Sequence, residues 1–220
     1  MMHGPGCCQP ALFPPLVKQL SSLIKSALPK MSDTISSENK ETDPPVLNTA
    51  RLHLRAINKA DSNDLFAIYA DRKTLEYWGR DPVQSPAEAW NMIRENMEHV
   101  AAGTAILWGI ALNDSEQLIG SCTLFKINHQ NRNCEIGYIL NRAYWGQGLM
   151  SEAIKCVIDH AFDVLDLHRI EADTDPKNLA SLALLEKLGF QREGYFRERW
   201  FVHAKWHDSV MLGLLRSDYL

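Results

Sequence analysis

The sequence of 220 residues contains few cysteines and lacks a long apolar run. Its five cysteines form no Cys-x-x-Cys pattern, so neither a disulfide framework nor a zinc site is indicated, and a reducing, cytoplasmic setting fits best. The longest mostly apolar stretch, residues 100–112, is too short to span a bilayer, and we expect no membrane partner. These absences exclude a disulfide-stapled scaffold and a protein that crosses membranes with helices.

Positive charge is also scarce. Lysine and arginine number 23 against 27 aspartates and glutamates, which gives a net charge of −4. A nucleic acid as direct partner is therefore not expected. His203, His207 and Asp208 look like a metal cluster, but their spacing on a turn between strands suits ligands poorly. We expect a surface turn there and no metal site.

The first residues differ from the rest. Residues 16–27 place leucines at helical spacing among lysines, and a polar stretch then ends at Pro44-Pro45. We predict a flexible N-terminal extension and linker over residues 1–47 and one folded domain over residues 48–220. A targeting or membrane-surface segment is the alternative for the amphipathic stretch.

The folded part alternates between strand and helix patterns. Strands are predicted over 49–57, 106–112, 118–126, 134–140, 169–174, 190–196 and 206–215, and helices over 62–71, 86–102, 148–165 and 179–188. The clearest helix start is Ser85-Pro86, with Glu88 three residues after the cap. Mixed order with one strand–loop–helix unit indicates an α+β fold with a partly antiparallel sheet.

A glycine-containing turn lies between the strand 134–140 and the helix that follows. Gly146 and Gly148 allow the backbone to approach a ligand closely, and the helix start offers unpaired N–H groups and partial positive charge. Together these features suit a phosphate. The pattern is neither a dinucleotide-binding fingerprint nor a Walker A loop, and an ordinary tight turn is the alternative.

A second block places Asn178 at a helix start, with Ser181 three residues later and Gly189-Phe190 at the helix end. Both blocks, with the opening Thr-x-Arg-Leu-x-Leu-Arg at 49–55, resemble the GNAT superfamily of N-acetyltransferases. The most similar subgroup is that of the ribosomal-protein N-terminal acetyltransferases for alanine and serine. The resemblance covers residues 48–220 and rests on four separated motifs in the family's order.

This resemblance implies a GNAT fold, in which helices flank a mixed, mostly antiparallel central sheet with a splayed strand pair. It implies acetyl-CoA as co-substrate, with its pyrophosphate on main-chain N–H groups of the glycine turn and its pantetheine arm beside the strand that precedes the turn. The cofactor-binding residues expected from it are Tyr138, Ile139, Leu140, Trp145, Gly146, Gln147, Gly148, Leu149, Met150 and Asn178.

The reaction would be aminolysis of a thioester, which needs a neutral amine and therefore a base. Glu135 resembles the strand carboxylate that some GNAT enzymes use, and a structural hydrogen bond is the alternative. Ser181 matches a serine proposed as proton donor in the subgroup, and a helix serine bonded to a backbone carbonyl is the alternative. Two positions depart from the family. Leu185 stands where many members have a tyrosine acid, and Ala143 where many have arginine or glutamine.

The resemblance favours acetylation of a protein's N-terminal α-amine, such as that of a ribosomal protein. The alternatives are a small-molecule amine N-acetyltransferase and a non-catalytic module that binds acyl-CoA. Tyr77, Trp78 and Arg80 belong to the region that covers the acceptor site in this family, although the two aromatics also suit core packing. We expect a cytoplasmic monomer or homodimer.

Overall fold

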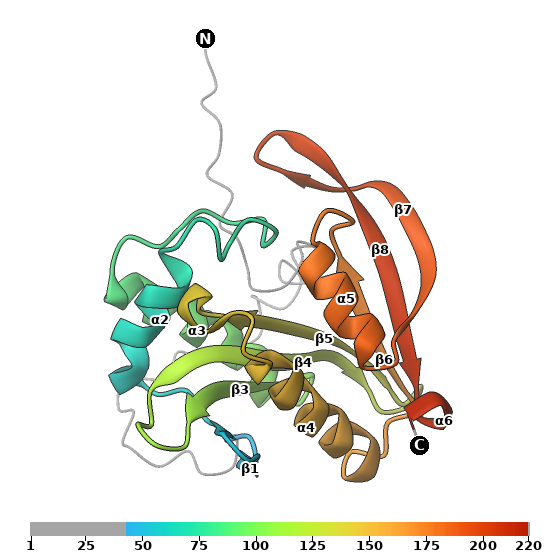
Figure 1. Cartoon of the computed structure of the whole chain (residues 1–220), viewed down its shortest axis with the longest axis horizontal. Helices are drawn as coiled ribbons and strands as arrows, with labels where there is room; N and C mark the ends of the chain where they lie inside the picture. Colours follow the sequence, from blue (N-terminus) through green and yellow to red (C-terminus); the bar gives the residue numbers. More distant parts are fainter. Residues whose placement is uncertain (1–42, 220) are drawn as a thin grey trace, which may run out of the picture.

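The computed structural model describes residues 43–219, in which eight strands form one sheet in the order β1-β2-β3-β4-β5-β6-β8-β7 (Figure 1). The strands are β1 (Leu47–Asn48), β2 (Leu52–Arg55), β3 (Ala105–Leu112), β4 (Leu118–Asn128), β5 (Asn133–Leu140), β6 (Arg169–Thr174), β7 (Gln191–Val202) and β8 (Lys205–Leu215). Neighbours are antiparallel except β5 and β6, which are parallel. The predicted mostly antiparallel α+β sheet is confirmed.

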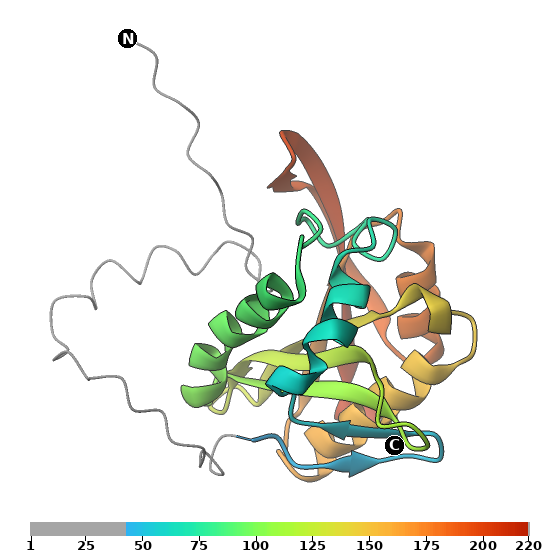
Figure 2. The same cartoon turned by 90° about the vertical axis from the view of Figure 1, so that its left-hand side faces the viewer.

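Helices cover both faces of this sheet (Figure 2). The helical elements are η2 (Lys59–Asp61), α2 (Ser62–Tyr69), α3 (Pro86–Ala101), η3 (Arg142–Tyr144), α4 (Leu149–Asp163), α5 (Leu179–Lys187) and α6 (Arg216–Tyr219), of which η2 and η3 are 3₁₀ helices. Two hydrophobic cores result. Ile154 of α4 and Leu185 of α5 lie in one, and Leu65 of α2 and Ile93 of α3 lie in the other.

The helix starts follow from their cap residues. Ser85 accepts a hydrogen bond from the backbone N–H of Glu88 at 3.2 Å, so α3 begins where the sequence predicts. Asn178 caps α5 in the same way. Helix α4 differs, because its cap is Gly148 in a left-handed conformation, with φ of 75° and no side-chain hydrogen bond. The first turn of α4 therefore keeps its N–H groups unsatisfied by a cap.

Strands β5 and β6 pair at only three positions, where residues 133–135 lie beside residues 169–171. Beyond them β5 continues to Leu140 along β4, while β6 continues to Thr174 along β8. The two halves of the sheet thus diverge, and residues 136–140 of β5 have no strand neighbour on the β6 side. This confirms the splayed pair that the resemblance implies.

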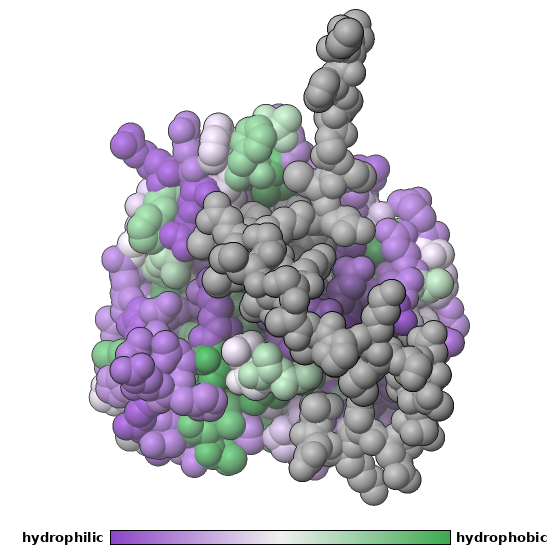
Figure 3. All heavy atoms as spheres, turned by 180° about the vertical axis from the view of Figure 1, so that it is seen from behind, coloured by the Kyte–Doolittle hydropathy of each residue, from purple (hydrophilic) through white to green (hydrophobic). Residues whose placement is uncertain are grey.

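The hairpin β7–β8 is longer than predicted. Strand β7 was expected to end at Phe196 but reaches Val202, after a register shift between Phe196 and Trp200. The charged segment Arg197-Glu198-Arg199 obscures the strand pattern, since Glu198 adopts a positive φ of 50° in this irregularity. Apolar side chains gather at the hairpin tip (Figure 3), where Val202 lies against Gly79.

The N-terminal part of the sheet begins before residue 48. The carbonyl of Pro45 accepts a hydrogen bond from the indole N–H of Trp108 at 2.8 Å, and Leu47 pairs with Leu54. The predicted strand 49–57 is shorter, because the chain turns at Thr49, whose N–H donates to the carbonyl of Leu52. The amphipathic stretch 16–27 lies outside the described residues. Within residues 43–219, none of the helices is long and apolar enough to cross a membrane.

Candidate active site

The glycine turn exposes backbone to solvent. Gly146 and Gly148 have φ of 73° and 75°, and a Cβ added at Gly146 would meet nothing within 4 Å. In α4 the N–H of Glu152 donates to the carbonyl of Gly148 at 3.1 Å, which leaves the N–H groups of Leu149 and Met150 at the uncapped helix start. This open, partially positive cradle suits an anionic group such as a phosphate.

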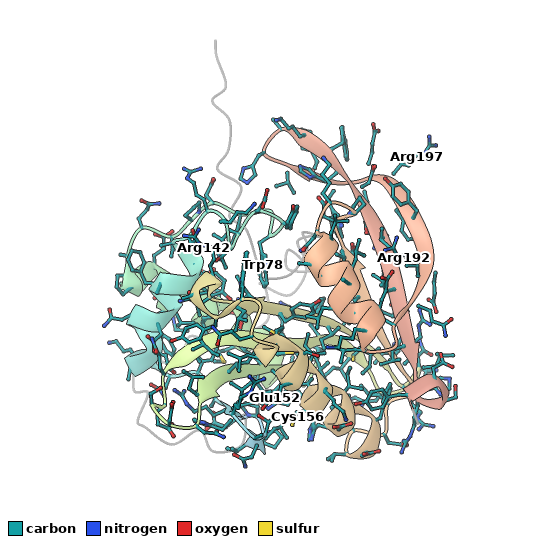
Figure 4. The ribbon with its side chains drawn as sticks, viewed as in Figure 1. Trp78, Arg142, Glu152, Cys156, Arg192 and Arg197 are labelled. Atoms are coloured by element: carbon teal, nitrogen blue, oxygen red, sulfur yellow. The ribbon has the colours of Figure 1, made fainter. Side chains whose placement is uncertain are left out.

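The opening motif supports this turn from behind. Glu152 on α4 (Figure 4) accepts hydrogen bonds from the hydroxyl of Thr49 at 2.6 Å, the N–H of Arg51 at 2.9 Å and the guanidinium of Arg51 at 2.7 Å. Arg51 in turn donates to the carbonyl of Gln147 at 3.0 Å. Burial raises the pKa of Glu152, but the hydrogen bonds from Thr49 and Arg51 outweigh it and lower the pKa. Sequence reasoning found the Thr-x-Arg motif but not this contact.

Trp145 fixes the entry into the turn. Its indole N–H donates to the carbonyl of Leu140 at 2.8 Å, while the residue as a whole remains 46% exposed. Asn141 accepts from the N–H of Ala143 at 3.0 Å and caps η3. The expected cofactor-binding residues 145–150 are therefore contiguous in space with the end of β5.

On the α5 side of the splay, three of the expected residues come together. The hydroxyl of Tyr138 lies 2.7 Å from Oγ of Ser181, and the N–H of Ser181 donates to Oδ1 of Asn178 at 3.1 Å. Burial raises the pKa of Tyr138 despite the hydrogen bond to Ser181. Leu185 is completely buried in the core, so it has only a packing role in α5.

Glu135 lies on the opposite face of the same strand. Side chains alternate along a strand, so Glu135 and Gly137 face away from Tyr138. Its carboxylate accepts a hydrogen bond from the ammonium of Lys126 at 2.5 Å, and its side chain is 13% exposed. The structure therefore separates the two candidate catalytic residues, with Glu135 on the α3 face and Ser181 on the α5 face.

A small pocket of about 20 Å³ opens beneath α3 on the Glu135 face. It is lined by Trp78, Asn96, Val100, Ala105, Leu107, Thr123, Phe125 and Gly137. Trp78 reaches it from the segment between α2 and α3 (Figure 4). Among the described residues, those that line the pocket include no carboxylate. Arg80 is buried nearby, with its guanidinium 5.7 Å from the centroid of the Tyr69 ring.

The suspected metal residues have separate partners. His207 lies 3.4 Å from a carboxylate oxygen of Asp175, and His203 lies 4.0 Å from one of Asp81. Asp208 accepts a hydrogen bond from the hydroxyl of Tyr195 at 2.5 Å. Within the described part of the chain, no group of histidine, cysteine and acidic side chains is arranged to hold a metal ion.

Residues 51–191 match the family model of the acetyltransferase (GNAT) domain. The chain belongs to the GNAT family. Similar proteins include an uncharacterized N-acetyltransferase, p20, of Bacillus licheniformis, 34% identical over 173 residues that cover 79% of this chain and 97% of that one. The [Ribosomal protein uS5]-alanine N-acetyltransferase of Escherichia coli is 30% identical over 181 residues, covering 79% and 92%.

Solved structures agree with this assignment. A spermidine N-acetyltransferase from Vibrio cholerae, solved in complex with CoA and spermine, aligns with a TM-score of 0.68 and 25% identity over 78% of this chain and 99% of that one. The GNAT fold expected from the sequence is confirmed, and this GNAT protein is an acetyl-CoA-dependent N-acetyltransferase. In this acetyltransferase the uncapped start of α4 and the free edge of β5 both leave backbone groups without a partner in the secondary structure.

Proposed function

We propose that this acetyltransferase modifies the N-terminal α-amine of a protein, such as a ribosomal protein. The pocket beneath α3 carries the proposal, because it is small and mostly apolar. About 20 Å³ admits a group the size of a methyl or a water molecule, which suits a small first side chain. The relative from Escherichia coli acts, by its name, on an alanine of a ribosomal protein.

In this proposal, the base and the hydrogen-bond donor to the thiolate act from opposite faces of the sheet. The glycine turn holds the pyrophosphate, residues 136–140 accompany the pantetheine arm, Asn178 contacts the cofactor, and α5 lies beside the thioester. Glu135 takes the proton of the amine, directly or through water, from the α3 face. As the nitrogen–carbon bond forms, the carbon–sulfur bond breaks and its electron pair leaves with sulfur. Ser181 donates a hydrogen bond to that thiolate from the α5 face.

A polyamine is the second candidate acceptor, because a spermidine N(1)-acetyltransferase of Vibrio cholerae is 26% identical over 171 residues. A polycation is best held by carboxylates, whereas the described pocket lining offers amide, hydroxyl and apolar groups. Arg80 adds a positive charge close by, since it contacts Met92 one helical turn from the lining residue Asn96. Both features favour a peptide N-terminus over a polycation as the acceptor.

The deciding experiment is a turnover assay that detects free CoA thiol. Peptides that begin with Ala, Ser, Met or Glu are compared with spermidine, spermine and free amino acids, and an N-terminally blocked peptide is the control. We expect peptides with a small first residue to give the highest kcat/KM, and mass spectrometry to find acetyl on the α-amine. A preference for spermidine would replace this proposal, and CoA binding without turnover of any amine would indicate a non-catalytic module.

The proposed setting is the cytoplasm. Cys122, Cys134 and Cys156 are free thiols in the structure, which suits a reducing compartment.

A further inference from the structure

Two hydroxyl groups meet between β5 and α5, the helix that follows β6. The phenol oxygen of Tyr138 lies 2.7 Å from Oγ of Ser181. Tyr138 stands three residues beyond Glu135, the last residue of β5 that pairs with β6. Ser181 is in the first turn of α5, where Asn178 holds its backbone N–H. The contact therefore joins β5 to α5 and fixes the serine side chain as well as its main chain.

Only one proton can lie between the two oxygens, so one hydroxyl donates and the other accepts. A phenol, with an ordinary pKa of about 10, is the stronger donor of the pair. Tyr138 therefore donates to Ser181, and the proton of Ser181 is left for a third group. Burial raises the pKa of Tyr138, which keeps the phenol protonated. Cys122, opposite Tyr138 on β4, is fully buried and its thiol pKa is also raised by burial, so it adds no charge.

We propose that Tyr138 is a positioning residue for acetyl transfer: it donates a hydrogen bond to Ser181 and thereby aims the serine hydroxyl at the sulfur of CoA. This rests on the proposed role of Ser181. A serine hydroxyl is a weak donor by itself, and accepting a hydrogen bond polarises its own O–H. The phenol keeps its proton throughout. Leu185 of α5 has no hydroxyl, so the phenol that polarises Ser181 is supplied by Tyr138 of β5.

The first test measures the thiol of bound CoA and needs no acceptor. The ultraviolet absorbance of its thiolate is titrated in the complex, with the desulfo-CoA complex as blank. A hydrogen bond to the thiolate lowers the thiol pKa. Tyr138→Phe and Ser181→Ala should therefore each lower the acid dissociation constant of the bound thiol about tenfold. The double variant should lose no more than Ser181→Ala alone, because both changes remove one linked interaction.

Tyr219→Phe is the matched control. Its hydroxyl also donates to a side chain, Asp159 at 2.7 Å, but on the outer part of α4. It should leave the bound thiol unchanged. Equal thiol pKa in wild type and Tyr138→Phe, or additive effects in the double variant, would overturn the proposal.

Steady-state kinetics give the second readout. Tyr138→Phe should lower kcat about tenfold with little change in KM for acetyl-CoA, because the hydrogen bond to sulfur strengthens only as the thiolate forms. A higher KM with unchanged kcat would mean that Tyr138 merely lines the pantetheine channel. If no amine is turned over, the proposed function fails, while the titration of bound CoA still decides the role of Tyr138.

Discussion

Arg51 donates to the carbonyl of Gln147 at 3.0 Å and is itself held by Glu152 at 2.7 Å. These two bonds tie the residue just before β2 to the glycine turn and to the first turn of α4. A peptide whose carbonyl is fixed on one side presents its N–H on the other. The pair therefore orients the groups that we expect to meet the pyrophosphate.

Replacing Arg51 should weaken CoA binding but hardly slow the chemical step. Arg51→Ala frees the carbonyl of Gln147, so the turn loses its preorganised shape and the Kd for CoA should rise about tenfold, with kcat little changed. Calorimetry measures the first and steady-state kinetics the second. The control is Arg132→Ala, because Arg132 makes the same pair of contacts, to the carbonyl and carboxylate of Asp166. Equal Kd values for both variants would refute the role of Arg51.

The glycine at the cap of α4 should be irreplaceable for binding. Gly148→Val places a side chain in the cradle, and a positive φ adds strain of about 1–3 kcal/mol. Gly103→Val is the matched control, since Gly103 has φ of 68° and open space around it but lies at the end of α3. Both variants should lose similar thermal stability, and only Gly148→Val should abolish CoA binding. Retained affinity in a folded Gly148→Val protein would contradict the assignment.

The pH dependence of turnover tests Glu135. An α-amine has a pKa of about 8, so near neutral pH most acceptor molecules must lose a proton before they attack. Glu135→Gln should lower kcat near neutral pH by roughly 100-fold, the low end of general-base contributions, and the loss should shrink as the pH rises above the pKa of the amine. Glu171→Gln is the control, because Glu171 is the register partner of Glu135 on β6 but bonds to Arg169. A constant loss across the pH range would exclude Glu135 as the base.

Local features of the site were predictable from sequence, whereas contacts between distant segments were not. The cap residues Ser85 and Asn178 and the turn glycine Gly148 act within a few residues, so composition and spacing reveal them. Tyr138 and Ser181 are 43 residues apart in the chain, and Arg51 and Glu152 are 101 apart. Such contacts depend on how distant segments pack against one another, which no local pattern encodes.

The domain boundaries show the same limit. Pro44-Pro45 looks like the end of a linker, because proline cannot donate to a sheet. The carbonyl of Pro45 can still accept, and it bonds to the indole of Trp108. The short strand β1 adds two residues to the sheet edge, too few for a hydrophobic pattern to appear.

The start of the folded domain can be tested by truncation. A chain that begins at Asp43 should melt like the full chain, whereas one that begins at Asn48 leaves the fully buried Trp108 without its acceptor. An unsatisfied buried donor costs about 1–3 kcal/mol. The melting temperature of the shorter chain should fall by several degrees, since each kcal/mol corresponds to about 2–4 °C at this size. Identical melting curves would place the boundary after Pro45.

Acid should remove one stabilising pair. The hydrogen bonds from Arg169 lower the pKa of Glu193 below its ordinary value of 4.5, so this carboxylate contributes stability above that pH and loses it as the pH falls through the lowered pKa. Near neutral pH, Glu193→Gln should have a slightly lower melting temperature, because its free energy of unfolding falls by at most about 1 kcal/mol for a partly exposed pair. The difference should vanish in acid. A difference that persists there would mean that the glutamate acts through packing.

Because β5 and β6 pair at only three positions, we expect the co-substrate to become part of the sheet when it binds along β5. Along residues 136–140 the peptide groups point alternately toward β4 and away from it, and the amide hydrogens that point away lack a strand neighbour and are open to exchange with water. An arm that lies along this edge shields them as an added strand would. Tight binding and local rigidity then become one property, and saturating CoA raises the melting temperature in proportion to the logarithm of its concentration. We therefore expect the free edge of β5 to gain a partner only in the complex with the co-substrate.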